Sequence, residues 1–317
     1  MSTFSAVVKD RSKADASFDL TGLLLLIPPP LFWAGNFVIG RAMHNDIPPM
    51  ALSFWRWLIA FVVLLPFALR PMRRDLQKYW NYRWRVLSIS LAGVVSFNSL
   101  VYLGLQSTTA ANGLLLNSFT PILIIVFAAI FYRQRLGLTQ SGGLVLSFAG
   151  VLTIVLQGDW SRLASLSFTH GDLMVFCAMV SWALYTLWLR GVPADINRIG
   201  LMGIQILLAL LVLAPLYAYE REFVSPQIWT LQSITALAYL GIFPSVFAYV
   251  LYNIAVKRVG ASKAGLSIHL IPVFGVVLAV LFLNEKVHGY HAVGMVAILA
   301  GVACAAGNWK WPKSQLP

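Results

Sequence analysis

Aromatic and amide side chains recur inside the long apolar runs of this chain, where a polar group is costly unless it faces protein or water. The candidate ligand-binding residues are Trp33, Asn36, Asn98, Tyr102, Asn117, Trp182, Tyr185, Tyr249, Tyr252, Asn253 and His269. Aromatic rings offer a flat apolar wall and stacking or cation–π contacts, and amides pair with carboxylate or ammonium groups. Together these side chains suit the binding of an amphipathic small molecule.

A structural interpretation competes with binding at each of these positions. Asparagines in membrane helices often only bond neighbouring helices, at ~0.6–2 kcal/mol each, and Asn253 is close enough to an expected helix end to cap it. Tyrosine and tryptophan also form belts at membrane interfaces. Because Trp33 and Trp182 lie more than a turn from their helix ends, we favour a cavity role for both. His269 is a candidate proton site, since histidine titrates near pH ~6.5, although a lone histidine more often bonds neighbouring helices.

Arg56 is the only lysine or arginine well inside an expected span. An arginine at the bilayer centre costs ~2.5–3.5 kcal/mol on insertion scales. Seven helical residues place it only ~10 Å from the outer end of its helix, so its side chain can extend toward the interface. We therefore expect a structural role, bonding backbone carbonyls near the outer mouth, in preference to a direct hold on a carboxylate ligand.

Missing residue types narrow the function further. No aspartate or glutamate lies in the interior of an expected span, because all eleven sit in tails, loops or helix ends. This argues against proton coupling through a carboxylate and against a cationic ligand. The sequence has no phosphate loop, and His269 stands without a cluster of metal ligands. We therefore expect no enzyme activity, no metal and no cofactor.

Composition places most of the chain in a membrane. Apolar residues make up 59% and charged residues 11% of the 317 residues, against ~45–50% and ~25% in soluble domains. A spanning helix needs ~20 mostly apolar residues. The expected spans are Leu20–Gly40, Met50–Leu69, Trp84–Leu105, Ala110–Phe131, Leu138–Leu156, Asp172–Leu189, Ile199–Tyr219, Thr230–Val256, Ser262–Leu283 and Tyr290–Ala306.

The second half of the chain repeats the first at an offset of 149 to 151 residues. Trp33 returns as Trp182, and Tyr102 returns as Tyr252. Each copy holds five spans, an odd number, so the second copy must lie upside down relative to the first. We therefore predict an all-α membrane protein with ten transmembrane helices arranged as two inverted five-helix repeats. Such duplication is typical of transporters that hold their substrate where the copies meet.

The distribution of positive charge sets the expected orientation. With the N-terminus inside and ten alternating spans, nearly every lysine and arginine falls on the cytoplasmic side. The exceptions are Arg41, Arg162, Arg221 and Lys286 outside, and Arg56 within a span. This asymmetry follows the positive-inside rule and predicts that both termini are cytoplasmic. Because the charges sit in short loops, the net charge of +12 does not indicate nucleic-acid binding.

Prolines and glycines indicate where helices are expected to kink, hinge or pack closely. The run Pro28-Pro29-Pro30 should kink the first span and free carbonyls just before the first candidate binding residues, in preference to a helix that starts at the prolines. Pro121 and Pro272 hold matched places in the fourth and ninth spans and are expected hinges. Small residues that let the fifth and tenth spans pack closely, as a scaffold, are Gly143, Gly150, Gly294 and Gly301.

Four ordered segments resemble the signatures of the drug/metabolite transporter superfamily, of the EamA type. They are Phe32-Trp33-Ala34-Gly35-Asn36-Phe37, Ser53-Phe54-Trp55-Arg56-Trp57, Gly171-Asp172-Leu173 with Ser181-Trp182-Ala183-Leu184-Tyr185, and Leu283-Asn284-Glu285. Gln134 departs from the pattern, because a glutamate matching Glu285 would be expected there. We divide the chain into a tail (1–19), a first repeat (20–157), an external linker (158–171), a second repeat (172–307) and a tail (308–317).

The resemblance implies a transporter of amino acids, other metabolites or drugs. We expect a secondary transporter that exports amino acids or related small amphipathic metabolites across a bacterial cytoplasmic membrane by alternating access. Its partners would be a small-molecule substrate and the lipid bilayer. An organophosphate or nucleotide-sugar exchanger of the same superfamily would need several lysines or arginines in the cavity. A membrane-embedded enzyme would need a nucleophile–base or metal cluster, and a receptor would have no use for two inverted halves.

Overall fold

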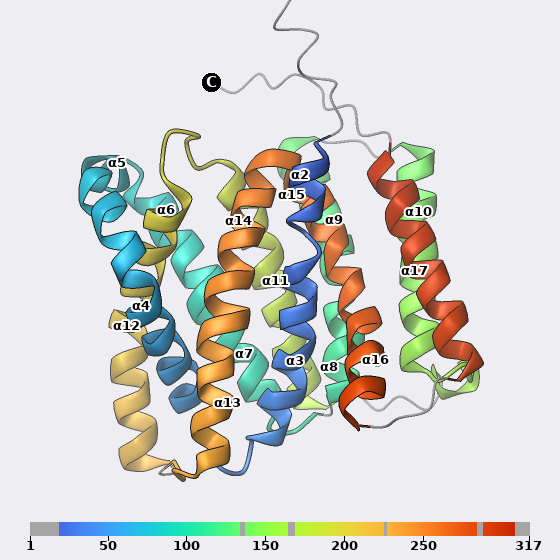
Figure 1. Cartoon of the computed structure of the whole chain (residues 1–317), viewed down its shortest axis with the longest axis horizontal. Helices are drawn as coiled ribbons and strands as arrows, with labels where there is room; N and C mark the ends of the chain where they lie inside the picture. Colours follow the sequence, from blue (N-terminus) through green and yellow to red (C-terminus); the bar gives the residue numbers. More distant parts are fainter. Residues whose placement is uncertain are drawn as a thin grey trace, which may run out of the picture.

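The computed structural model describes residues 19–108, 110–133, 137–163, 169–224, 227–283 and 288–307. Over these ranges the chain is helical with short connections and has no β-strand, so the predicted all-α fold is confirmed (Figure 1). The tails 1–18 and 308–317 lie outside the described residues, as do Gln134, Asn284 and Glu285 of the sequence motifs.

Ten apolar helical segments form the bundle. Seven are long enough to cross a membrane, and three further apolar helices are shorter over the described residues. In chain order the segments are α2 (Leu20–Leu24) with α3 (Pro28–Ala42); α4 (Pro49–Arg74); α6 (Arg83–Ser90), η1 (Leu91–Ser96) and α7 (Phe97–Gly104); α8 (Ala110–Asn117) with α9 (Thr120–Tyr132); α10 (Leu138–Val155); α11 (His170–Arg190); α12 (Arg198–Phe223); α13 (Leu231–Ile242), η3 (Phe243–Phe247) and α14 (Ala248–Val259); α15 (Ala261–Leu266), η4 (Ser267–His269) and α16 (Leu270–Leu283); and α17 (Gly289–Gly307). The short α5 (Leu76–Asn81) joins the second segment to the third, and the turn η2 (Trp160–Leu163) follows the fifth.

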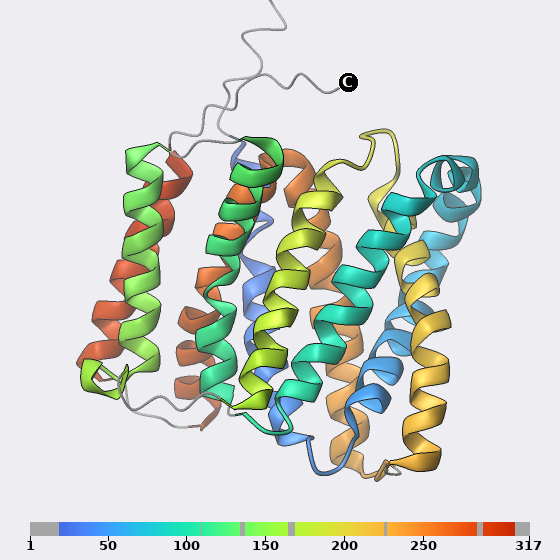
Figure 2. The ribbon, with the colours of Figure 1, turned by 180° about the vertical axis from the view of Figure 1, so that it is seen from behind.

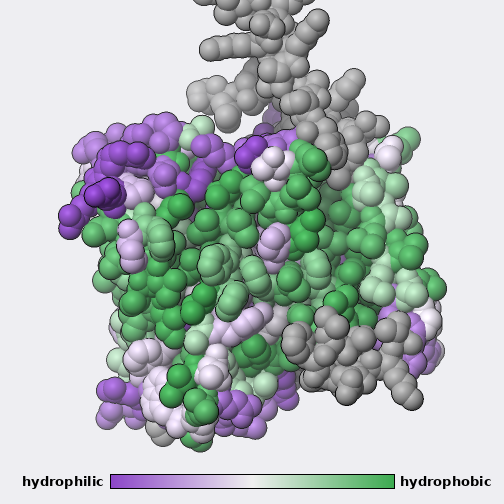
Figure 3. All heavy atoms as spheres, viewed as in Figure 1, coloured by the Kyte–Doolittle hydropathy of each residue, from purple (hydrophilic) through white to green (hydrophobic). Residues whose placement is uncertain are grey.

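The outer surface of the bundle is apolar over most of its height. Figure 3 shows a broad apolar band between two polar margins on the face in view. Large apolar side chains such as Val62, Phe67 and Leu211 lie exposed on the spanning helices. A soluble protein rarely exposes an apolar area of this extent, so the band marks the surface that lipid covers. The chain is a multi-pass membrane protein.

Two pairs of matched helices from the two halves of the chain pack along each other in opposite directions. At one end of the bundle α4 packs along α12, its counterpart in the repeat, and at the other end α10 packs along α17 (Figures 1 and 2). A Cβ atom on Gly143 would lie 2.6 Å from the carbonyl oxygen of Gly301, and one on Gly150 would lie 2.7 Å from that of Gly294. The close approach of α10 and α17 therefore requires these glycines.

Carboxylates join α4 and α12 at both of their ends. Glu220, near the end of α12, accepts hydrogen bonds from the amides of Met50 (3.0 Å) and Ala51 (2.7 Å) in the first turn of α4. Asp75, which caps the end of α4, accepts one from the amide of Asn197 (3.0 Å), the residue before α12. The first amides of a helix lack partners within it, so each carboxylate satisfies donors of the opposing helix.

The first span breaks just before its three prolines. The helix α2 ends at Leu24, and α3 starts at Pro28, with Pro29 and Pro30 in its first turn. Proline is tolerated in a first turn because the amide it lacks would have no partner there. The expected kink at the prolines is not observed: a helix starts at Pro28, which is the alternative that the sequence analysis set aside, and α3 is continuous through Ala42. The interruption of the span lies at residues 25–27, before Pro28. The segment still reaches across the bundle because α2 supplies the missing length.

Matched interruptions occur in four other spans. The fourth span breaks between α8 and α9, where Pro121 is the second residue of α9, and the ninth breaks at η4, with Pro272 in the first turn of α16. The third and eighth spans contain the π-helical turns η1 and η3, which the hydropathy pattern does not predict. Turns of this kind loosen the helix ladder and are frequent at functional sites.

Candidate functional site

Five aromatic rings from both repeats pack together between the two halves, and we call them the aromatic cluster. Trp33 of α3 meets Trp182, its counterpart on α11, with ring centroids 5.1 Å apart. Tyr249 and Tyr252 of α14 lie 5.2 and 5.4 Å from Trp182, and Tyr185 lies 5.1 Å from it. The structure thus brings five of the residues predicted from sequence into direct contact.

Arg56 lies buried in a set of side-chain oxygens, which we call the Arg56 cluster. Its Nη1 donates to Asn36 Oδ1 at 2.7 Å and to the Tyr102 hydroxyl at 2.6 Å, and its Nε donates to Ser245 Oγ at 2.5 Å. The Tyr102 hydroxyl also donates to Asn36 Oδ1 at 2.9 Å. The expected backbone carbonyls are not these partners. Among the described residues no carboxylate forms a salt bridge with Arg56, so its positive charge remains uncompensated.

Trp57 connects the Arg56 cluster to the aromatic cluster. The guanidinium carbon of Arg56 lies 5.2 Å from the centroid of the Trp57 ring. That ring in turn meets Tyr249 edge to face at 5.1 Å. Neither Trp57 nor Ser245 was among the predicted site residues. A sequence signal existed only for Trp57, which follows Arg56 directly, whereas the contact of Ser245 with Arg56 depends on how α4 packs against η3.

The second repeat carries a related but neutral arrangement. The Tyr185 hydroxyl donates to Asn253 Oδ1 at 2.6 Å. In the first repeat the amide of this kind of pair comes from the first span and the phenol from the third. In the second repeat the phenol comes from the sixth span and the amide from the eighth. At an offset of 149 residues from Arg56 stands Gln205. Its side chain is fully buried, and neither its Oε1 nor its Nε2 has a hydrogen-bond partner. The repeats therefore differ in charge at matched positions.

Freed backbone carbonyls in the two π-helical turns hold the aromatic cluster. The indole nitrogen of Trp33 donates to the carbonyl of Pro244 in η3 at 3.0 Å, and the Tyr249 hydroxyl donates to the carbonyl of Gly93 in η1 at 2.7 Å. A Cβ atom on Gly93 would lie 2.3 Å from Tyr185 Cδ2. The turns thus position three rings of the cluster. In the sequence, the only signs of the two turns are Gly93 and Pro244.

Two asparagines leave a polar atom without a partner beside the rings. Asn98 Nδ2 donates to the Tyr249 hydroxyl at 3.2 Å, but Asn98 Oδ1 has no hydrogen-bond partner among the described residues. Asn117 Nδ2 likewise has none. Buried polar groups are nearly always hydrogen-bonded, so these two atoms are available to a ligand or to water.

The space between the rings is nearly closed in this conformation. Trp33, Asn36, Asn117 and Trp182 line a cavity of about 10 Å³, which holds about one water molecule. Pockets for small molecules measure ~300–1,000 Å³. In this conformation the cavity is therefore far smaller than a small-molecule site.

His269 is not brought into contact with the aromatic cluster. Its Nε2 meets the carbonyl of Ser118 at 2.9 Å, and its Nδ1 meets Ser147 Oγ at 2.7 Å. These bonds join the turn η4 to the break in the fourth span and to α10. The geometry is that of a hydrogen-bonded contact between helices. Tyr252, unlike His269, belongs to the aromatic cluster, and its hydroxyl lies 3.2 Å from Thr186 Oγ1.

The assembled groups are suited to holding a small molecule. Rings, amides, hydroxyls and one guanidinium converge from α3, α4, α7, α11 and α14 and from the turn η3. Over the ranges that the structure covers, no group of three or more His, Cys, Asp or Glu side chains is placed to hold a metal ion. The set resembles a binding site of mixed apolar and polar character.

Comparison with known proteins agrees with this arrangement. The EamA-like transporter family matches residues 20–156 and again 169–307. The chain is 29% identical to an uncharacterized transporter of Archaeoglobus fulgidus, over 88% of this chain and 95% of that one. It is 25% identical to an uncharacterized transporter of Bacillus subtilis, over 92% and 95% of the two chains. A crystal structure shares the fold with a TM-score of 0.72 at 21% identity, covering 90% of this chain and 96% of that one. The two matched segments together span most of the chain, which therefore belongs to the EamA-like transporter family.

Proposed function

We propose that this transporter exports amino acids, or related small amphipathic metabolites with a carboxylate, across a bacterial cytoplasmic membrane by alternating access. The observation that carries the proposal is the buried guanidinium of Arg56, which Asn36, Tyr102 and Ser245 hold without a carboxylate from the described part of the chain. An ionisable residue inside a membrane is costly and usually serves function. A substrate carboxylate would supply the missing negative charge.

The neighbouring groups fit the rest of such a substrate. Arginine binds carboxylates through two parallel N–H bonds. The faces of Trp33, Trp182 and Tyr249 offer apolar contact to the body of the substrate and cation–π contact to an ammonium group. Asn98 Oδ1, which has no partner in this conformation, is an acceptor for that ammonium group. The proposal differs from the structural role that the sequence favoured for Arg56.

The inverted pairing supports alternating access. Two halves of similar structure and opposite direction can exchange conformations, so that one shape opens to one side and the other shape to the opposite side. The cavity of about 10 Å³ corresponds to a closed form between these shapes. On the positive-inside rule, both chain ends face the cytoplasm. In the structure, the first described helix starts and the last one ends at the same edge of the bundle (Figure 1).

The direct experiment is transport by purified protein in liposomes over a panel of compounds, with and without a pH gradient. The panel contains amino acids, amines without a carboxylate, and phosphorylated metabolites. We expect saturable exchange of one or more amino acids or related carboxylates. Transport of phosphorylated metabolites alone would favour the exchanger alternative and overturn the proposal, and so would transport of amines alone.

The Arg56→Gln variant tests the role of the guanidinium. We expect its KM for the carboxylate substrate to rise about ten-fold or more, the range for losing a charge-assisted hydrogen bond. Arg133→Gln removes an exposed cation at the end of α9 and serves as the matched control, with an unchanged KM. Equal KM values for wild type and Arg56→Gln would contradict the proposed carboxylate site.

A further inference from the structure

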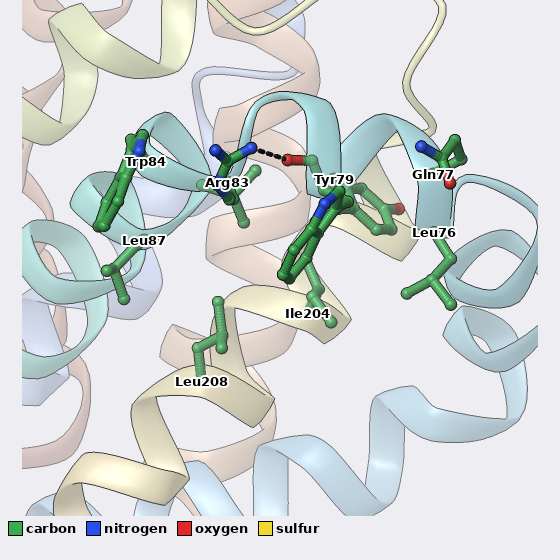
Figure 4. Close-up of a pocket in the computed structure, with 10 residues that line it drawn as sticks. Leu76, Gln77, Tyr79, Arg83, Trp84, Leu87, Ile204 and Leu208 are labelled. Atoms are coloured by element: carbon green, nitrogen blue, oxygen red, sulfur yellow. Dashed lines mark hydrogen bonds between the residues drawn. The ribbon is translucent and has the colours of Figure 1, made fainter.

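A second hollow lies away from the aromatic cluster, on the outside of the bundle. It is an open groove of about 630 Å³ between the α5–α6 elbow and α12. Leu87, Ile204 and Leu208 line its apolar floor, and Tyr79 and Trp84 flank it (Figure 4). Trp80 also lines the groove. The groove joins the first repeat to the second, because the elbow belongs to one and α12 to the other. No role in transport follows from the proposed function for these residues.

A fixed cation stands at the rim of this groove. Arg83 lines it, and its guanidinium carbon lies 5.4 Å from the ring centroid of Trp80 and 5.9 Å from that of Trp84. Its Nη1 donates to the carbonyl of Trp80 at 3.2 Å (Figure 4). Among the described residues it forms no salt bridge with a carboxylate. The charge is thus held in place and exposed above an apolar floor.

The surrounding segment is strongly basic. Between residues 70 and 85 the cations are Arg70, Arg73, Arg74, Lys78, Arg83 and Arg85, and the one carboxylate is Asp75. Arg74 and Lys78 are engaged by Asp75. Arg70, Arg73 and Arg83 remain exposed. A positive field of this kind at the end of a spanning helix attracts anionic lipid.

We propose that the groove binds an anionic glycerophospholipid of the bilayer. Its phosphate pairs with Arg83, and one acyl chain lies over Ile204 and Leu208. Trp80 and Trp84 are 65% and 71% exposed, as expected of rings at the level of the headgroups. An interfacial belt alone would need neither a hollow of this size nor a cation at its rim. The bound lipid would link the elbow of the first repeat to α12 of the second.

Native mass spectrometry of the detergent-purified full chain tests this proposal without measuring transport. The protein is titrated separately with dioleoyl-phosphatidylglycerol and dioleoyl-phosphatidylcholine. We expect wild type to retain the anionic lipid about five-fold more strongly, and Arg83→Gln to lose that preference, since a basic residue near a membrane surface contributes about this factor. Leu208→Trp, which fills the groove, should reduce retention of both lipids.

Arg73→Gln is the matched control, because it removes an exposed cation of the same segment that does not line the groove. We expect it to keep the lipid preference of wild type. Equal retention of the two lipids by wild type would overturn the proposal, as would an equal loss of preference in Arg73→Gln and Arg83→Gln. Retention unaffected by Leu208→Trp would show that the acyl chain does not lie in the groove. Thermal melting of each variant confirms that it is folded.

Discussion

At the scale of single residues, the central question is how a buried guanidinium is held when no carboxylate of the described segments pairs with it. Arg56 is 1% exposed, and its three acceptors come from the first, third and eighth spans. Each bond to a charged donor stabilises more than a neutral one. The cluster therefore binds both repeats to α4 and leaves one positive charge beside the aromatic rings.

Replacing Tyr102 with phenylalanine tests this cluster. The change removes one acceptor of Arg56 and one donor to Asn36. We expect a loss of about 1.5–3 kcal/mol of stability, the range for a hydrogen bond to a charged group, measured as a lower melting temperature in detergent. Tyr132→Phe is the control, because its hydroxyl makes one long bond of 3.5 Å to a carbonyl. Equal melting temperatures for the two variants would contradict the importance of the Tyr102 hydroxyl.

The sequence singled out most of the side chains that the structure brings together, but not their hydrogen-bond partners. Trp33 and Trp182 could be found because they stand at matched positions of the repeat and far from helix ends. The partners of Arg56 could not be predicted, because a long side chain near a helix end can reach either the interface or the protein interior. Gln205 was not predicted, although it stands at the position of the second repeat that matches Arg56 of the first.

At the scale of helices, the contact of α10 with α17 leaves no room for added volume. A Cβ on Gly150 would lie 2.7 Å from a backbone carbonyl of α17, which cannot move aside alone. We expect Gly150→Ala to destabilise the protein by about 1–3 kcal/mol, the usual cost of overpacking. Gly142→Ala on the same helix meets open space and should leave the melting temperature unchanged or slightly raised. A lower melting temperature for Gly142→Ala than for Gly150→Ala would refute the proposed scaffold.

The π-helical turn η1 makes a second prediction at this scale. Gly93→Ala would drive a methyl group into the ring of Tyr185, displacing it from Trp182 and Asn253. We expect this variant to transport substrate at least ten-fold more slowly, since small misplacements of binding groups have effects of about that size or larger. Gly275→Ala, where a Cβ meets nothing within 4 Å, is the control. Wild-type transport by Gly93→Ala would show that the position of Tyr185 does not matter.

Hydropathy predicted the spans but not their interruptions. Each of the ten apolar segments lies close to its expected range, because a run of ~20 apolar residues has few other structures available in a membrane. The turns η1 and η3 leave this pattern unchanged, since they alter only the hydrogen-bond ladder. At Pro28-Pro29-Pro30 the sequence indicated a break but not its place, which depends on whether α2 packs as a separate short helix.

At the scale of the whole molecule, Asp75 and Glu220 join the opposite ends of α4 and α12. The hydrogen bond from Arg74, together with the amide of Asn197, holds the pKa of Asp75 below its usual range. Because this pKa is lower in the folded state, the ionised carboxylate stabilises the fold at any pH above its pKa in the unfolded chain, which is ~3.9. This stabilisation is lost as the pH falls through the lower pKa that Asp75 has in the folded protein.

The Asp75→Asn variant tests that linkage. We expect its melting temperature to be lower than that of wild type above about pH 5, with the difference shrinking as the pH falls below about 4. Asp195→Asn removes an exposed partner of Lys78 and should have little effect at any pH, because surface ion pairs stabilise weakly. A difference between wild type and Asp75→Asn that is independent of pH would contradict the assignment.

The inverted pairing of the halves was predictable, whereas the conformation was not. Five spans per repeat is an odd number and forces the inversion. The closed cavity between Trp33 and Trp182 depends on how the two repeats pack against each other, which no residue pattern records. Substrate identity is likewise absent from the pattern, because rings and amides bind many amphipathic molecules.

Transport of the identified substrate by Trp182→Ala and Asn98→Ala, each in liposomes beside wild type, is the most direct test of a site between the repeats. Trp160→Ala is the control, because Trp160 is 49% exposed in the turn η2. We predict that both site variants lose most of their transport while the control keeps it and all three remain folded. Wild-type rates in both Trp182→Ala and Asn98→Ala would show that the substrate crosses elsewhere.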